Sequence, residues 1–156
     1  MKISILLCSV ALLAAACAKS PGPVTYKTGI DSYSGPYDGT NAIAYDSGDT
    51  VTVFIPRDCP SFSCNEVKSG GNLDKELVKK DCPKAQFLMV TFKGKPAVGK
   101  MALDGVVHID SGGANGLNLD NSQLELATVS PLVASVHVPG DETVEGVFGA
   151  KMCPTK

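Results

Sequence analysis

Thr50-Val51-Thr52-Val53-Phe54-Ile55 decides the fold class, because its residues are β-branched or aromatic in an unbroken run. Such residues favour extended strands, and Pro56 directly after them favours the end of the strand. A second strand is predicted at 85–93, where the sequence is apolar at consecutive positions. A strand that is apolar on both faces is typical of the interior of a sheet.

Turn signals separate further short strands along the chain. Asp104-Gly105 predicts a hairpin because this pair suits a type I′ turn, and 139–142 (Pro-Gly-Asp-Glu) predicts another. About seven to nine short strands with regular turns predict an all-β or mainly β fold, a small antiparallel sandwich or barrel, with the sandwich favoured. The remaining strands are expected at 24–28, 98–103, 106–110, 123–129, 133–138 and 143–150.

One short helix is predicted at 72–80. Gly70-Gly71 precede it, Asn72 is a suitable N-cap, and lysines lie near its C-terminal end. A helix of this length is marginal by itself, and Cys64 and Cys82 flank it. The sequence therefore predicts one short helix with disulfide-forming cysteines on either side.

The first seventeen residues are typical of an export signal. Lys2 provides the positive start, and 3–16 is an apolar run interrupted by two serines. This run is shorter than the ~20 apolar residues that a membrane-spanning helix needs. The sequence therefore predicts a signal peptide at 1–16 and an exported protein.

Ala14-Ala15-Ala16-Cys17 resembles the lipobox of bacterial lipoproteins, although Leu13 stands one place before the position where that motif prefers leucine. The resemblance covers the leader alone. It implies cleavage before Cys17, a lipid on Cys17, and a Pro- and Gly-containing tether at 17–23 that links the protein to a membrane surface. By the same resemblance, Ala18 instead of Asp after the cysteine implies sorting to the outer membrane. Ordinary cleavage at an Ala-x-Ala site, which would give a periplasmic or secreted protein, is the alternative.

Four cysteines remain once Cys8 leaves with the signal and Cys17 carries lipid. An even number in an oxidising compartment predicts two disulfides, for which three pairings exist. We favour a nested arrangement, with Cys64–Cys82 inside Cys59–Cys153. Four residues separate the first two of these cysteines, which is not the spacing of a redox motif or a zinc knuckle.

The length and composition of the mature chain predict one globular domain, at 24–156. The net charge is −2 and Arg57 is the only arginine, which argues against a nucleic-acid partner. Lysines dominate 57–100 and carboxylates dominate 101–145. This distribution indicates either solvated faces or a polarised surface that steers a charged partner.

The segment 29–49 is rich in Gly, Ser, Asp and Asn and contains Tyr33, Tyr37 and Tyr45. Tyrosines among such residues are typical of recognition loops, because they offer a large contact area at low entropic cost. These three residues are the predicted partner-binding surface. The alternative is that their rings cover the end of the core.

Oxygen donors of the kind that calcium prefers lie in the loop 110–121. The loop lacks EF-hand spacing, so calcium is a weak hypothesis. His108 and His137 alternate with aliphatic residues and are expected to point away from the apolar faces of their strands, as surface residues or as a metal pair. The candidate ligands in the loop are Asp110, Asn115, Asn118 and Asp120.

No catalytic constellation is visible in the sequence. Asp110-Ser111-Gly112-Gly113 resembles the segment around the nucleophile of chymotrypsin-like proteases, but His108 lies too close and the chain is too short for two barrels. No paired carboxylates and no phosphate-binding glycine loop stand out. We therefore expect a protein that is not an enzyme and needs no cofactor.

These observations favour a membrane-anchored lipoprotein of the bacterial envelope that binds another envelope or extracellular macromolecule, such as a protein or the cell wall. Inhibition of a foreign enzyme is a variant of this hypothesis. The alternative is a binder of metal or another small ligand.

Overall fold

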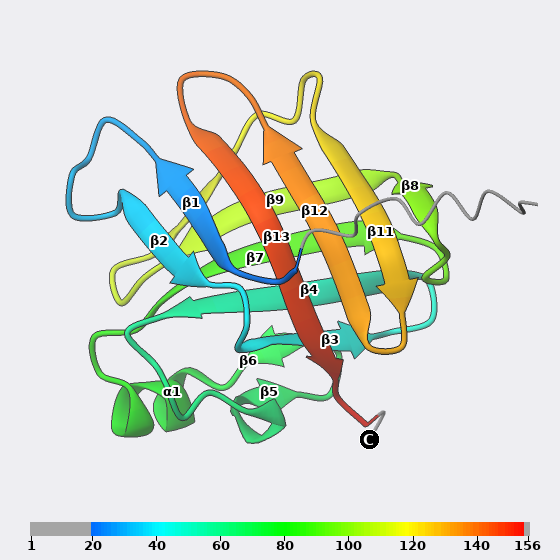
Figure 1. The fold of residues 1–156 in the computed structure, drawn as a ribbon. Coiled ribbons are helices and arrows are strands. Elements are labelled where there is room, and N and C mark those ends of the chain that lie inside the picture. The colour runs from blue at the N-terminus through cyan, green and yellow to red at the C-terminus, as the bar shows by residue number, and fades with distance from the viewer. Residues whose placement is uncertain (1–19, 155–156) are drawn as a thin grey trace, which may run out of the picture.

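The computed structural model describes residues 20–154, and strands make up most of this part of the chain (Figure 1). The predicted mainly β fold with one short α-helix is confirmed. The strands are β1 (Pro23–Lys27), β2 (Gly35–Asp38), β3 (Ala42–Asp46), β4 (Thr50–Arg57), β5 (Val67–Lys68), β6 (Asn72–Leu73), β7 (Gln86–Lys93), β8 (Gly99–Met101), β9 (Leu103–Ile109), β10 (Ala114–Gly116), β11 (Gln123–Val129), β12 (Leu132–Val138) and β13 (Thr143–Met152). The helical elements are the 3-10 helix η1 (Cys64–Glu66) and α1 (Lys75–Asp81).

Eleven strands form one curled sheet in which nine follow the order β10-β9-β7-β4-β3-β13-β12-β11-β8, while β1 pairs with β13 and with β2. Only Ala102 separates β8, which pairs with β11, from β9, which pairs with β7. The chain therefore turns a corner here and joins the two ends of the sheet. Figure 1 shows the result as a front layer of β1, β2, β11, β12 and β13 that crosses a back layer of β3, β4, β7 and β9.

The sheet differs from the prediction in two details. It has more strands than the predicted seven to nine, because β2 and β10 are only four and three residues long and carry little periodic signal, and β3 lies in the segment 29–49, for which the sequence predicts a loop. It is also not wholly antiparallel, since the end of β13 runs parallel to β3, with Ala150 opposite Ala42.

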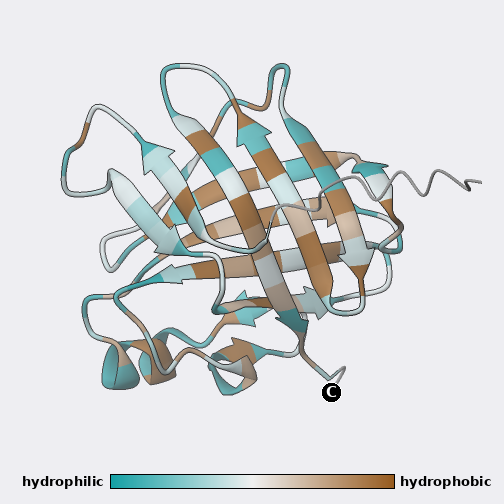
Figure 2. Ribbon diagram, viewed as in Figure 1, coloured by the Kyte–Doolittle hydropathy of each residue, from teal (hydrophilic) through white to brown (hydrophobic). Residues whose placement is uncertain are grey.

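The main core lies between the two layers and follows from alternation along each strand. In β4, Val51, Val53 and Ile55 point into this core, whereas Phe54 belongs to a second apolar cluster on the opposite face of the back layer. Figure 2 shows the same banding of polar and apolar residues along β11, β12 and β13. A back layer that is apolar on both faces explains why β4 is buried at four consecutive residues, 53–56.

β7 is an interior strand, as predicted, with β4 on one side and β9 on the other. The predicted hairpin at Asp104-Gly105 is wrong, because both residues lie inside β9. The register with β7 shifts there, and Lys93 pairs with Asp104 at 2.8 Å. The Asp-Gly pair therefore marks an irregularity inside a strand, a role that glycine also fills.

The other predicted hairpin is confirmed. β12 and β13 are antiparallel, with Val138 opposite Val144 across the turn at 139–142. The helix begins later than predicted: Asp74, and not Asn72, is the N-cap, and its carboxylate accepts hydrogen bonds from the backbone of Glu76 and Leu77.

The N-terminal boundary of the folded part also differs from the prediction. The Gly22 amide donates to the Val147 carbonyl at 2.9 Å, and β1 begins at Pro23, so the end of the predicted tether 17–23 is bound to β13. The signal peptide and Cys17 lie outside the described residues. Within residues 20–154, no helix is long and apolar enough to cross a membrane.

Candidate functional site

A groove of about 610 Å³ lies on the outer face of the back layer, between the sheet and α1. Its floor comes from neighbouring strands, because Met89 of β7 stands between Phe54 of β4 and Val107 of β9. Phe87 and Ile109 form a second pair beside that row. The floor is therefore a continuous apolar surface.

The helix covers this floor incompletely. Leu73 and Val78 pack against the second apolar cluster, yet no residue of α1 is buried. Met89 and Ile109 are likewise only partly buried, although they belong to the same cluster. An apolar surface that the chain leaves half covered is typical of a ligand-binding or protein-binding site.

Two disulfides fix the segment that carries the helical wall. Cys59–Cys82 joins the loop after β4 to the C-cap of α1, and Cys64–Cys153 joins η1 to the chain after β13. The prediction that these four cysteines form two disulfides is confirmed, but the nested pairing is wrong. The pairs interleave because η1 lies next to the end of β13, which the sequence does not reveal.

Charges of opposite sign border the groove. Lys75 and Lys79 line it on the helix side together with Glu76, and Asp110 lines it at the turn between β9 and β10. The interaction with the Tyr33 side chain has the largest effect on Asp110 and lowers the pKa of its carboxyl group. Hydrogen bonds from the backbone amides of Gly112 and Gly113 lower this pKa further. Asp110 is therefore a stable negative charge at neutral pH.

The predicted tyrosine surface is wrong for two of its three residues. Tyr37 is 1% exposed in the main core, and Tyr45 is 8% exposed in the second cluster, where its hydroxyl accepts from the Gly70 amide. Tyr33 is partly exposed and packs against the main core. The alternative, that these rings close the core, describes Tyr37 and Tyr45 correctly.

A second polar constellation lies at one end of the main core, around His108. The expectation that this residue points away from the apolar face is wrong, since it is 2% exposed on the inner face of β9. Its ring lies between those of Tyr26 and Tyr33, with centroid distances of 5.2 and 4.6 Å. His137 is exposed, as expected, so the two histidines have opposite surroundings.

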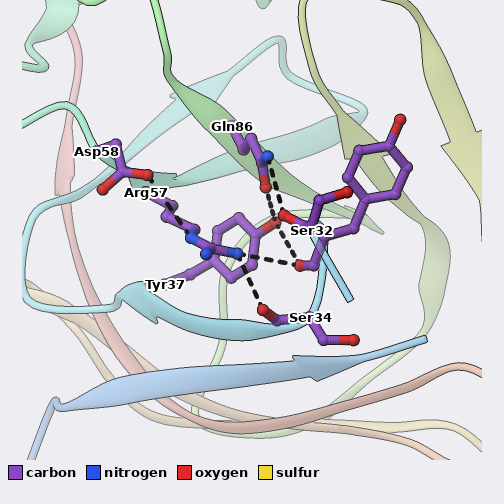
Figure 3. A network of polar contacts seen from close by, with 7 residues as sticks. Ser32, Ser34, Tyr37, Arg57, Asp58 and Gln86 are labelled. Atoms are coloured by element: carbon purple, nitrogen blue, oxygen red, sulfur yellow. Dashed lines mark hydrogen bonds and ion pairs between the residues drawn. The ribbon is translucent and has the colours of Figure 1, made fainter. Parts of the chain in front are cut away.

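Hydrogen bonds anchor the tyrosines around His108. The Tyr37 hydroxyl donates to Gln86 at 3.1 Å, and Arg57 lies over the Tyr37 ring while donating to the Ser34 carbonyl at 3.1 Å (Figure 3). On the other side, the Tyr26 hydroxyl donates to Glu142 at 2.9 Å. Burial, the larger cause in both cases, raises the pKa of Tyr26 and of Tyr37 to about 12.

The four candidate calcium ligands do not converge. Asp110 caps its own turn, Asn115 donates to Glu142, and Asn118 and Asp120 bond to each other. Among residues 20–154 no group of three or more His, Cys, Asp or Glu residues is placed to hold a metal ion. The loop therefore uses its polar side chains to shape itself.

Comparisons with known proteins found no matching family model, no similar curated protein and no similar solved structure.

The groove was missed at the sequence level because its residues alternate with core residues on the same strands. One signal was present: Val107 and Ile109 flank His108, so one of the two faces of β9 had to carry two aliphatic residues. The sequence-based prediction put the face with Val107 and Ile109 in the interior, and His108 was therefore expected at the surface. The structure shows the opposite arrangement, with the aliphatic pair lining the groove.

Proposed function

We propose that the protein is a lipid-anchored binding module of the bacterial envelope, and that the groove between α1 and the back layer receives an apolar segment of a partner protein. The anchor follows from the resemblance of the leader to a lipobox at Cys17. The observation that carries the binding role is the half-covered apolar floor of Met89, Val107 and Ile109.

The groove also restricts the partner. Its volume of about 610 Å³ lies within the range of roughly 300–1,000 Å³ that is common for small-ligand sites, so it has room for only a short segment of a partner protein. Lys75 and Lys79 favour acidic residues on the helix side of the bound segment, and Asp110 favours a basic residue at the other end. Inhibition of a foreign enzyme would be one use of such binding.

Site-specific photocrosslinking in the intact host tests the proposal. A photoreactive residue at Val107 is expected to give a discrete adduct with a protein, whereas one at Ser135, exposed on the front layer, gives none. The adduct should weaken several-fold in the K75E/K79E variant, because rim charges affect the rate of association. Equal adducts at both positions would contradict the proposal, and a lipid or other small molecule at Val107 would favour the small-ligand alternative.

A further inference from the structure

His108 is a buried titratable group that does not line the groove. Its ring is stacked on Tyr26 and tilted against Tyr33, and the ring of Tyr37 meets it edge-on at 6.3 Å. These tyrosines belong to β1, to the connection after β1, and to β2, respectively. One histidine of the back layer thus contacts every part of the β1–β2 hairpin.

The surroundings suit a neutral imidazole. Nε2 of His108 is buried and has no hydrogen-bond partner among the described residues. The nearby carboxylates are engaged by other donors: Glu142 accepts from Tyr26, Thr28 and Asn115, and Asp110 accepts from two backbone amides. A second proton on the ring would therefore be buried without a free acceptor, which is costly.

The charged groups around the ring act in opposite directions. Burial has the largest effect and lowers the pKa of His108, Arg57 also lowers this pKa, and the carboxylates of Asp110 and Glu142 oppose the shift. The titratable and charged groups that face His108 are Tyr26 on β1, Tyr33 after β1, Tyr37 on β2, Arg57 on β4, Asp110 after β9 and Glu142 in the turn before β13.

We propose that His108 is an acid-sensitive latch, and that its protonation releases the β1–β2 hairpin from the rest of the sheet. The hairpin is suited to local opening because its attachment to β13 is short: three residues of β1 are in register with it, 25–27 against 143–145, and one further hydrogen bond joins the Gly22 amide to the Val147 carbonyl. Among the described residues β2 pairs in the sheet with β1 alone, and the Tyr37 hydroxyl adds one side-chain hydrogen bond, to Gln86 of β7. Opening would expose the three tyrosines and the edge of β13 at 143–145.

The direction of the effect follows from linkage. Because the pKa is lower with the latch closed, the closed form is fully stable above the ordinary histidine value of about 6.5 and loses stability as the pH falls toward the lowered value. In this window one proton increases the opening constant by up to about tenfold per pH unit. The opposite sign, tighter closure at lower pH, would contradict the latch.

Hydrogen exchange of the full-length protein tests the latch between pH 7 and pH 5, after correction for the intrinsic pH dependence of exchange. Amides of β1 are expected to lose protection by up to about tenfold per pH unit, while amides of β4 keep theirs. The chain has two histidines, so H137Q is the matched control and should behave like wild type. H108Q should show no pH dependence in β1.

Each other outcome overturns the proposal. Protection in β1 that does not change with pH excludes a latch, and equal loss in β1 and β4 shows global unfolding instead of local opening. If the pH dependence of β1 is lost in H137Q, then His137 and not His108 causes it, and the proposal is wrong. If H108Q does not fold, NMR of the wild type decides: His108 must titrate below the ordinary histidine value of about 6.5, and the amides of β1 must lose protection over the same pH range.

Discussion

The two faces of β9 differ in how completely the chain covers them. On the inner face, Val106 and His108 are buried, and His108 is enclosed by tyrosines that hydrogen bonds hold in place. On the outer face, Val107 and Ile109 line a groove whose helical wall has no buried residue. The same strand therefore supports a closed polar cluster on one side and an open apolar site on the other.

The two regions also depend on different interactions. Both disulfides lie on the side of the groove, where they fix a helix that packs loosely. The His108 cluster is held by aromatic packing and by hydrogen bonds such as that from Tyr26 to Glu142. This difference suggests that the groove and the cluster can be disturbed separately.

The largest effect is expected from removal of the long-range disulfide. Cys64 and Cys153 are separated by 89 residues, so the C64S/C153S variant should lose about 4–5 kcal/mol of unfolding free energy on the chain-entropy account. Removal of Cys59–Cys82, with a separation of 23, should cost less, about 3 kcal/mol. Urea unfolding under non-reducing conditions measures both, and the reverse order would contradict this account.

A slightly smaller loss is expected for Y37A, on the side of the cluster. Tyr37 is 1% exposed, and truncation of a buried aromatic residue typically costs about 3–5 kcal/mol. Y37F keeps the ring and loses only the hydroxyl that donates to Gln86, so it should cost about 1 kcal/mol. A Y37A variant as stable as wild type would show that the ring is not enclosed.

Adjacent valines on β9 compare the two faces directly. Val106 is 1% exposed in the main core, so V106A should cost about 2 kcal/mol. Val107 is half-buried in the groove, so V107A should cost less than about 1 kcal/mol. Equal costs in thermal or urea unfolding would remove the distinction between a packed and an open face.

A loss of about 1 kcal/mol is expected for D74A, which removes the N-cap of α1. Its readout is local: the amides of Glu76 and Leu77, which donate to Asp74, should exchange faster while those of β4 are unchanged. D81A at the other end of α1 is the control, because a carboxylate there opposes the helix dipole. Equal effects of the two variants would argue against capping by Asp74.

Much of the fold could be predicted from local patterns. The β-branched run of β4, the apolar β7 and the turn at 139–142 indicated the correct strands, and the even cysteine count indicated two disulfides. Features that depend on contacts between distant segments could not be predicted. The pairing of Cys64 with Cys153 depends on the position of the end of β13, which no local pattern encodes.

The candidate site was harder to predict, for a physical reason. Alternation along β9 separates two faces but does not show which of them is the interior. The side with Val107 and Ile109 is the more apolar, yet it lines the groove, while His108 is enclosed because Tyr26 and Tyr33 supply its apolar surroundings. A buried histidine of this kind can be recognised only once its aromatic neighbours are known.

Carbene footprinting of β7 and β9 tests the central claim most directly, by comparison of the purified protein with the protein in intact host cells. We predict that Met89, Val107 and Ile109 are labelled in the purified protein and protected in the cells, while His108 is unlabelled in both. Equal labelling of the groove residues in the two states would contradict a binding role for the groove, and labelling of His108 at neutral pH would contradict its enclosure.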